Sequence, residues 1–241
     1  MVSELRSRKL KSSPRKVGGN DRPHEAGDGK KSGRKKAKKG ASTPAGGVLG
    51  RLLDWDRRIT LKCSVCAAPT SGLTRVLRYF FKAMEISGHG VPWIVLPLAL
   101  LWTSDDEWMQ EFLLNLLAGI FLDLVVSVVL KAAVRRPRPA VNKDDMFLAF
   151  SVDSKFSFPS GHCTRAAMLA ILFLAKLHLT VAQAAAFLLW VLGIGASRLC
   201  LGRHHVTDIV CGMAIGYLQG LFILRYWLPI ETLNSLKNSF T

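Results

Sequence analysis

Apolar residues gather into five segments in the later part of the chain, with polar stretches between them. These segments cover residues 90–102, 112–130, 166–177, 181–201 and 209–228. The second segment has Asn115 and Asp123 as its strongly polar members. At a rise of about 1.5 Å per residue, a helix of this length fits the hydrocarbon core of a bilayer. The pattern therefore predicts an all-α fold, a polytopic membrane helical bundle.

Residues 51–87 mix apolar with basic side chains, and two interpretations of this segment stay open. Over residues 73–85 the pattern is typical of an amphipathic helix with a basic face, which predicts an interfacial helix. A surface helix leaves five spans, whereas a crossing helix makes six. The two counts place the end of the 112–130 segment on opposite sides of the membrane.

Net charge divides the chain into a tail and a body. The chain has 33 Lys and Arg against 17 Asp and Glu, a net charge of +16, yet 49% of its residues are hydrophobic. Residues 1–50 hold 14 of the basic and 4 of the acidic residues and have few apolar side chains to bury. We therefore predict a disordered basic tail, because such a segment cannot offset its ordering entropy. A solvated tail that sets topology, attraction to anionic lipid headgroups, and a nuclear address are its three interpretations.

This combination excludes an ordinary soluble enzyme and a small disulfide-stapled domain. Cys63 and Cys66 form a lone C-x-x-C pair, and no second pair completes the four ligands that a zinc site needs. We predict no metal, no cofactor and no nucleic acid partner. The membrane and its lipids are the expected surroundings.

Glycines recur at four-residue intervals in the last apolar segment, at positions 212, 216 and 220. This spacing puts a smooth stripe on one face of a helix and favours close helix packing. The same stripe permits a homo-oligomer.

Three clusters of polar residues border the apolar segments. They are Lys131 with Arg138, then Ser160 with Gly161 and His162, and then Arg198 with His204 and Asp208. Because consecutive spans alternate in direction, all three clusters fall at one end of the bundle. Ionisable groups at a membrane edge are costly unless they are paired or used, so the clusters predict a functional site.

The residue types in these clusters suit a phosphate group. The planar fork of arginine matches phosphate oxygens, and the Ser160–Gly161 turn at a helix N-terminus offers backbone N–H groups to the same anion. His204 and Asp208 are four residues apart. On a helix, the carboxylate would accept from one ring nitrogen and leave the other free as a nucleophile. His162 would then protonate the departing oxygen.

These residues resemble the three signature motifs of the type 2 phosphatidic acid phosphatase superfamily, also called lipid phosphate phosphatases. The motifs are Lys131-x6-Arg138-Pro139, Pro159-Ser160-Gly161-His162 and Ser197-Arg198-x5-His204-x3-Asp208. The resemblance implies a six-helix bundle, a phosphohistidine intermediate on His204, and His162 as the acid. The phosphate ligands that it implies are Lys131, Arg138, Ser160, Gly161 and Arg198.

The segments 85–90 and 145–147 are similar to the polyisoprenoid diphosphate phosphatase branch, the presqualene diphosphate phosphatases of the endoplasmic reticulum and nuclear envelope. Under that resemblance, residues 88–230 form a membrane phosphatase domain. Its expected substrates are presqualene, farnesyl and geranylgeranyl diphosphates, the matching monophosphates and other lipid phosphates. The expected location is the endoplasmic reticulum membrane, with the nuclear envelope as a second location.

Simpler interpretations compete with these assignments. We assign Arg135 and Arg136 to anchoring the chain at the membrane surface. His205 competes with His204, but the spacing to Asp208 favours His204. The rival functions are a catalytically weak relative that acts as a scaffold in the nuclear envelope or endoplasmic reticulum, and an anionic-lipid tether. Neither explains why every motif residue is intact.

Overall fold

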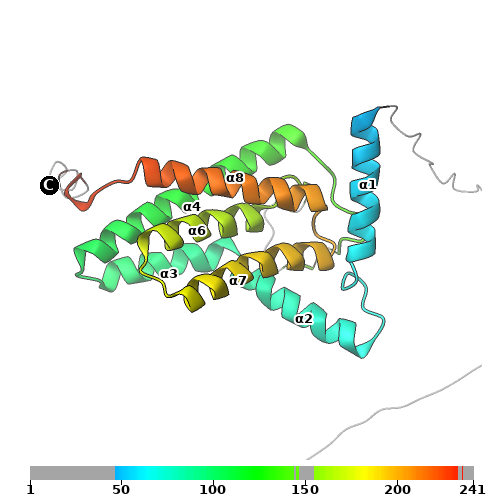
Figure 1. Ribbon diagram of the computed structural model, residues 1–241, viewed down its shortest axis with the longest axis horizontal. Helices are drawn as coiled ribbons and strands as arrows, with labels where there is room; N and C mark the ends of the chain where they lie inside the picture. Colours follow the sequence, from blue (N-terminus) through cyan, green and yellow to red (C-terminus); the bar gives the residue numbers. More distant parts are fainter. Residues whose placement is uncertain (1–46, 144, 147–154, 233–234, 236–241) are drawn as a thin grey trace, which may run out of the picture. The chain divides into compact units, whose positions relative to one another are not determined.

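The computed structural model describes residues 47–143, 145–146, 155–232 and 235, and within them the fold is all-helical (Figure 1). The long helices are α1 (Val48–Cys63), α2 (Gly72–Ser87), α3 (Gly90–Thr103), α4 (Glu107–Val134), α6 (Gly161–Lys176), α7 (Val181–Cys200) and α8 (Val206–Arg225). The predicted all-α helical bundle is confirmed. The predicted basic tail lies outside the described residues, except that α1 already begins at Val48.

The helix boundaries follow capping signals in the sequence. Ser71 and Thr180 each begin a helix with a capping box. In this motif the side chain of the first residue accepts a hydrogen bond from the backbone N–H three residues later, and the side chain of that later residue accepts one from the backbone N–H of the first. Asp106 accepts a hydrogen bond from the Trp108 N–H and begins α4. Figure 1 shows that α4 and α7 end, and α6 and α8 begin, at the same end of the bundle. This is the convergence that the alternation of spans predicts.

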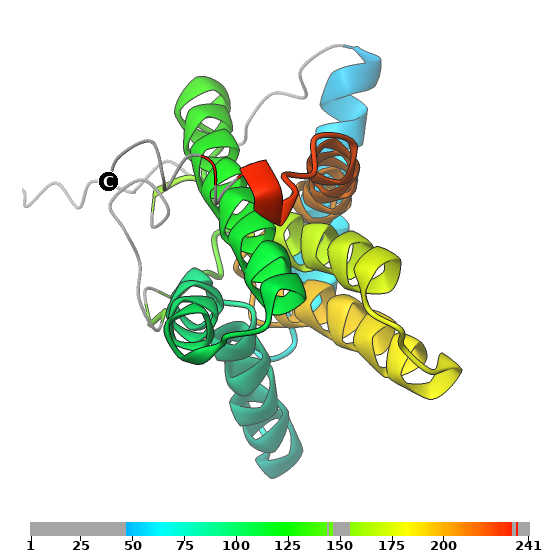
Figure 2. The same cartoon turned by 90° about the vertical axis from the view of Figure 1, so that its left-hand side faces the viewer.

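Helix α6 lies at the centre, in contact with α4, α7 and α8 (Figure 2). Toward its C-terminal half it contributes apolar side chains to a core shared with α4 and α8, among them Met168, Leu169 and Leu172, all fully buried. Its N-terminal turn instead contains buried polar groups. Buried polar groups are therefore concentrated where α6 begins, whereas its C-terminal half packs in an apolar core.

Three helices, α4, α7 and α8, are long and apolar enough to cross a membrane. A fourth candidate is the pair α2 and α3, which bend by 46° at the break between them. This count over the described residues is lower than the five or six spans predicted. The difference has a physical reason: α6 has 16 residues, about 24 Å of helix, which is short of a hydrocarbon core of about 30 Å.

The glycine stripe of α8 faces α6. A Cβ added at Gly216 would lie 1.9 Å from the carbonyl oxygen of Thr164, and one at Gly212 would lie 3.0 Å from that of Ser160. Only glycine lets the two backbones approach this closely. The stripe therefore sets the distance between α8 and the start of α6.

Replacing Gly216 with Ala should force α6 and α8 apart. We expect the free energy of unfolding to fall by about 1–3 kcal/mol or more, as overpacking does in other cores. Thermal unfolding in detergent measures the change. Gly72→Ala is the matched control, because an added Cβ there has nothing within 4 Å. Equal midpoints for the two variants would contradict the packing role of Gly216.

Candidate active site

Polar side chains gather at the end of the bundle where α6 and α8 begin (Figure 1). The predicted site residues lie here as follows: Lys131 in the last turn of α4, Arg138 in the loop after it, Ser160, Gly161 and His162 at the start of α6, Arg198 in the last turn of α7, His204 in the α7–α8 loop, and Asp208 in the first turn of α8. Six of them are at most 7% exposed: Lys131, Ser160, His162, Arg198, His204 and Asp208.

The imidazole of His204 is fixed through one ring nitrogen. Its Nδ1 lies 2.7 Å from the carbonyl oxygen of Ser157. Because a carbonyl only accepts, Nδ1 donates, and Nε2 keeps its lone pair. Burial, together with the charges of Arg138, Arg198 and Lys131, holds the pKa of this imidazole well below its ordinary range. His204 is therefore neutral at pH 7, as a nucleophile must be.

The partner of His204 differs from the one predicted. Its Nδ1 lies 3.9 Å from Asp208 Oδ2, which is too long for a hydrogen bond. The prediction placed both residues on one helix face, but α8 begins at Val206, so His204 precedes the helix. Asp208 instead accepts a hydrogen bond from the backbone N–H of His205, at 2.8 Å. The carbonyl of Ser157 was not singled out, because no side chain marks it in the sequence.

Arg136 is not a simple surface anchor, and that prediction is wrong. One of its guanidinium nitrogens lies 2.6 Å from Asp208 Oδ1 and the other lies 2.5 Å from Asp56 Oδ2. Asp56 belongs to α1 and is fully buried; it also accepts hydrogen bonds from the backbone and hydroxyl of Thr207. Arg136 thus joins α1 to the start of α8.

Glu85, in the last turn of α2, is the main acidic residue that was not assigned to the site. Its carboxylate accepts from Arg198 Nη1 at 2.7 Å and from Arg203 Nη2 at 3.3 Å. All three side chains are buried. Arg203 also pairs with Asp145 at 2.8 Å. Two buried arginines need a carboxylate partner, and Glu85 is that partner. The sequence does not identify it, because the contact depends on how α2 packs against α7.

The turn before α6 is held by two hydrogen bonds, and it contains the buried hydroxyl of Ser160. Lys131 Nζ donates to the carbonyl of Pro159 at 2.7 Å, and the Ser160 N–H donates to the carbonyl of Asp208 at 3.2 Å. The Ser160 hydroxyl is fully buried and has no oxygen or nitrogen partner within the described residues. Such a group costs free energy until it finds an acceptor. A phosphate oxygen beside Gly161 would supply one.

His162 lies on the α2 side of the same cluster. Its Nε2 lies 3.1 Å from the backbone carbonyl of Glu85, so this nitrogen donates and carries the proton. The ring of His89, which caps α3, is 5.9 Å away between centroids. His162 therefore has a proton on the nitrogen that faces the backbone carbonyl of Glu85.

Comparison with known proteins relates this end of the chain to one family. Residues 112–230 match the model described as the PAP2 superfamily, and this range contains every predicted site residue. A probable lipid phosphate phosphatase beta of Arabidopsis thaliana is 31% identical over an alignment of 147 positions, and the match covers 49% of this chain and 67% of the relative. Decaprenylphosphoryl-5-phosphoribose phosphatase of Mycobacterium tuberculosis is 30% identical over an alignment of 140 positions, and the match covers 56% of this chain and 71% of the relative.

Two solved structures are similar in fold. Aquifex aeolicus LpxE is 26% identical, with a TM-score of 0.50, and the match covers 72% of this chain and 94% of that one. A PAP2-type phosphatidylglycerolphosphate phosphatase from Bacillus subtilis has a TM-score of 0.55 at 23% identity, covering 73% and 86%. The second likeness concerns the fold alone.

The lowered pKa of His204 predicts how stability depends on pH. Between the folded pKa and the unfolded value near 6.5, the unfolded chain binds more protons, so the free energy of unfolding should fall as pH falls below about 6.5. One such group contributes up to about 1.4 kcal/mol per pH unit. Thermal midpoints of the wild type and His204→Gln between pH 7.5 and 5 measure it. The variant should show a shallower decline, whereas the exposed His178→Gln should keep the wild-type slope. Parallel curves for the wild type and His204→Gln would contradict the assignment.

Proposed function

The chain belongs to the PAP2 superfamily and is a membrane-embedded phosphatase, and we propose that it removes phosphate from isoprenoid diphosphates and monophosphates. The observation that carries the proposal is the burial of Lys131 and Arg198 beside a neutral His204, with Arg138 also near it. Three cations around one nucleophile fit a transferring phosphoryl group, whose equatorial oxygens they would stabilise.

The proposed reaction has two steps. His204 Nε2 attacks the phosphorus while the bond to the leaving oxygen breaks, and His162 gives its proton to that oxygen. Water then attacks the phosphorus of the phosphohistidine while His162 takes a proton from the water, and the P–N bond breaks, which releases inorganic phosphate and restores both histidines. The Ser160 hydroxyl and the N–H groups that begin at Gly161 are proposed to bind the phosphate oxygens, together with Lys131, Arg138 and Arg198.

Asp208 has a different role in this proposal from the one that its spacing suggested. It holds the backbone of His205 and the guanidinium of Arg136, and both contacts border the turn that carries His204. Asp208 is therefore a positioning residue, which keeps the imidazole aligned with the carbonyl of Ser157. The side chain acts on the reaction through the backbone of the loop.

The substrate class rests on the resemblance of segments 85–90 and 145–147 and on relatives. The Mycobacterium tuberculosis relative is named decaprenylphosphoryl-5-phosphoribose phosphatase, after a substrate that contains a decaprenyl chain. Apolar side chains exposed on α4, α7 and α8, such as Phe121, Leu189 and Leu218, provide a surface along which an isoprenoid tail would lie. The proposed location is the endoplasmic reticulum membrane, with the nuclear envelope second.

The alternative function is that of a catalytically weak relative that acts as a membrane scaffold. The buried Ser160 hydroxyl has the Cys163 thiol beside it, which is a weak hydrogen-bonding group and leaves the hydroxyl able to bind a stronger acceptor such as a phosphate oxygen. This capacity supports a phosphate-binding role. The enzyme is therefore the better proposal.

Replacing His204 with Ala should lower the rate of phosphate release from farnesyl diphosphate by at least about 10³-fold, because the nucleophile is lost. The assay uses purified chain in detergent. His178→Ala is the control, since this exposed histidine lies in the loop between α6 and α7. Comparable membrane insertion of the variants separates catalysis from folding. A His204→Ala protein with near-normal turnover would refute the proposed nucleophile, and an inactive wild type would favour the scaffold.

A further inference from the structure

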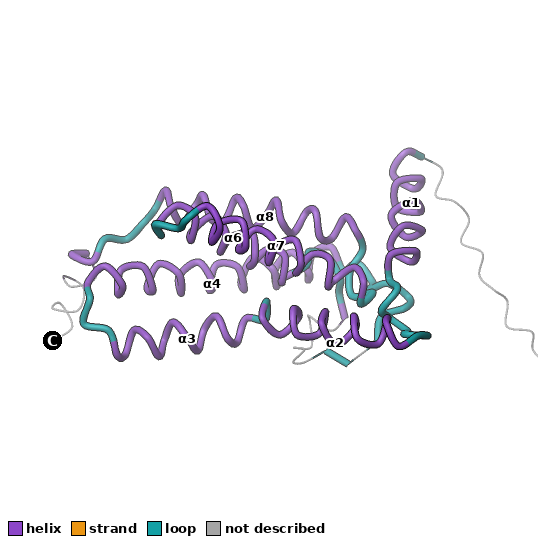
Figure 3. The backbone as a smooth tube through the Cα atoms, turned by 60° about the horizontal axis from the view of Figure 1, so that its bottom comes forward, coloured by secondary structure: helices purple, strands orange, loops and turns teal. Residues whose placement is uncertain are grey.

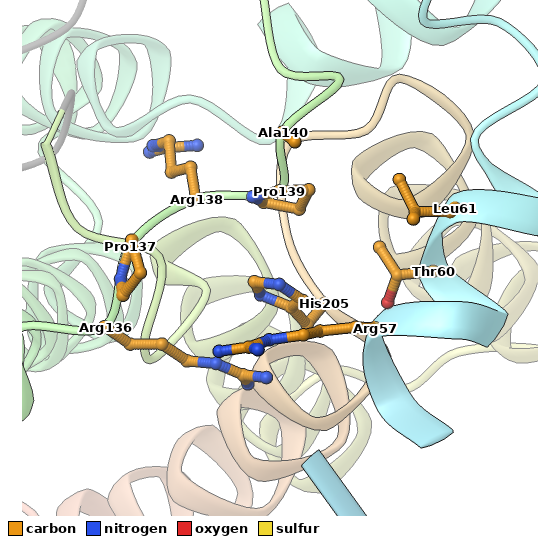
Figure 4. A pocket seen from close by; sticks show the side chains of 9 residues that line it. All are labelled: Arg57, Thr60, Leu61, Arg136, Pro137, Arg138, Pro139, Ala140 and His205. Carbon is orange, nitrogen blue, oxygen red and sulfur yellow. The ribbon is translucent and has the colours of Figure 1, made fainter. Parts of the chain in front are cut away.

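A cationic cavity lies beside the proposed active site. It has a volume of about 250 Å³ and is bordered by α1 and by the loop after α4 (Figure 4). The lining residues are Arg57, Thr60, Leu61, Arg136, Pro137, Arg138, Pro139, Ala140 and His205. His204, His162 and Ser160 do not line it. The cavity is therefore distinct from the phosphate cluster, with which it shares Arg138.

Positive charge dominates this cavity. Three of its lining residues are arginines, and none of the described residues that line it is acidic. Asp56 and Asp208 pair with Arg136 from outside the lining. Arg57 has an ion pair with Asp54 at 3.9 Å, in which both side chains are substantially exposed. An exposed ion pair of this kind contributes little to stability, so Arg57 can still bind another anion.

The side chain of Arg57 is directed into the cavity. Figure 4 shows that it reaches from α1 beneath His205 toward the side chain of Arg136. Arg136 is already paired with two carboxylates, whereas Arg57 has only the exposed pair with Asp54, so an anion in the cavity would gain its new charge partner chiefly in Arg57. Phosphate is the anion whose oxygens best match the planar fork of arginine.

The position and composition of α1 indicate where such a phosphate would come from. The helix runs across the end of the bundle rather than along it (Figures 1 and 3). It exposes several large apolar side chains: Val48, Leu49, Leu52, Trp55 and Leu61. Arg51, Arg58 and Lys62 are exposed beside them. A helix with this composition lies at the level of the lipid headgroups, with its apolar side chains in the membrane.

We propose that the cavity binds the phosphate of an anionic phospholipid headgroup, taken from the membrane on which α1 lies. The lipid would hold Arg57 against Arg136 and thereby fix α1 to the loop that carries Arg138. Helix α1 precedes the range matched by the family model, so the α1 wall of the cavity lies outside that match, whereas the loop after α4 and His205 lie inside it. The proposal involves no reacting atom and does not depend on the proposed catalytic function.

The test compares Arg57→Gln with Arg58→Gln, its neighbour on α1 that does not line the cavity. Purified full-length chain in a zwitterionic detergent is titrated with dioctanoyl phosphatidylglycerol, and the midpoint of thermal unfolding is recorded. At about ten times its Kd, the lipid should raise the midpoint of the wild type and of Arg58→Gln by about 3–6 °C. Arg57→Gln should shift by less than about 1 °C. Dioctanoyl phosphatidylcholine, which is zwitterionic, should have little effect on any of them.

Two further measurements, with inorganic phosphate and with His204→Ala, distinguish binding in this cavity from binding at the His204 cluster. Inorganic phosphate should stabilise the wild type, Arg57→Gln and Arg58→Gln equally, because it binds the cluster around His204. His204→Ala should keep the full response to phosphatidylglycerol, so a failure of the catalytic proposal would not affect this one. Equal lipid responses in Arg57→Gln and Arg58→Gln would overturn the site. A phosphate response that Arg57→Gln alone loses, without any lipid response, would overturn the assignment to a headgroup.

Discussion

Cationic side chains buried at one end of a helix bundle need acidic or carbonyl partners, and this requirement organises the whole site. Arg198 and Arg203 are fully buried, and the carboxylate of Glu85 accepts hydrogen bonds from both. Because Glu85 lies in the last turn of α2, these pairs fasten α2 to the end of α7 and to the loop before α8. Without that carboxylate, two buried guanidinium groups would be left uncompensated, at a cost of several kcal/mol.

A bound phosphate, like the carboxylate of Glu85, would be a negatively charged partner for the buried cations. Arg198 uses Nη1 for Glu85, whereas its Nε is buried without a partner among the described residues. One guanidinium can therefore hold the carboxylate and still offer a donor to an anion. On the proposed mechanism, the site is assembled before the substrate arrives. The catalytic cations need only small adjustments, which is the condition for electrostatic preorganisation.

The sequence was sufficient for the all-helical fold and for the end at which the polar groups meet, because apolar periodicity and alternating direction determine both, but it overestimated the number of membrane spans. It was insufficient for partners that depend on tertiary contact. Ser157 acts through its backbone carbonyl, which carries no side-chain signal. Asp56 and Glu85 lie in the first helices, where mixed apolar and basic residues left the packing undetermined. The predicted hydrogen bond between Asp208 and His204 is wrong because α8 begins two residues after His204. The four-residue spacing therefore does not place the two side chains on one helix face.

Detection of the phosphorylated intermediate tests the central claim, that His204 is the nucleophile of a phosphoryl transfer, most directly. The wild-type chain would be quenched in alkaline denaturant during turnover of farnesyl diphosphate, since phosphohistidine is labile in acid, and then fragmented in a mass spectrometer. The account predicts a phosphoryl group on His204 and none on His205. Phosphorylation of another residue, or steady turnover with no covalent phosphate at any time, would contradict it.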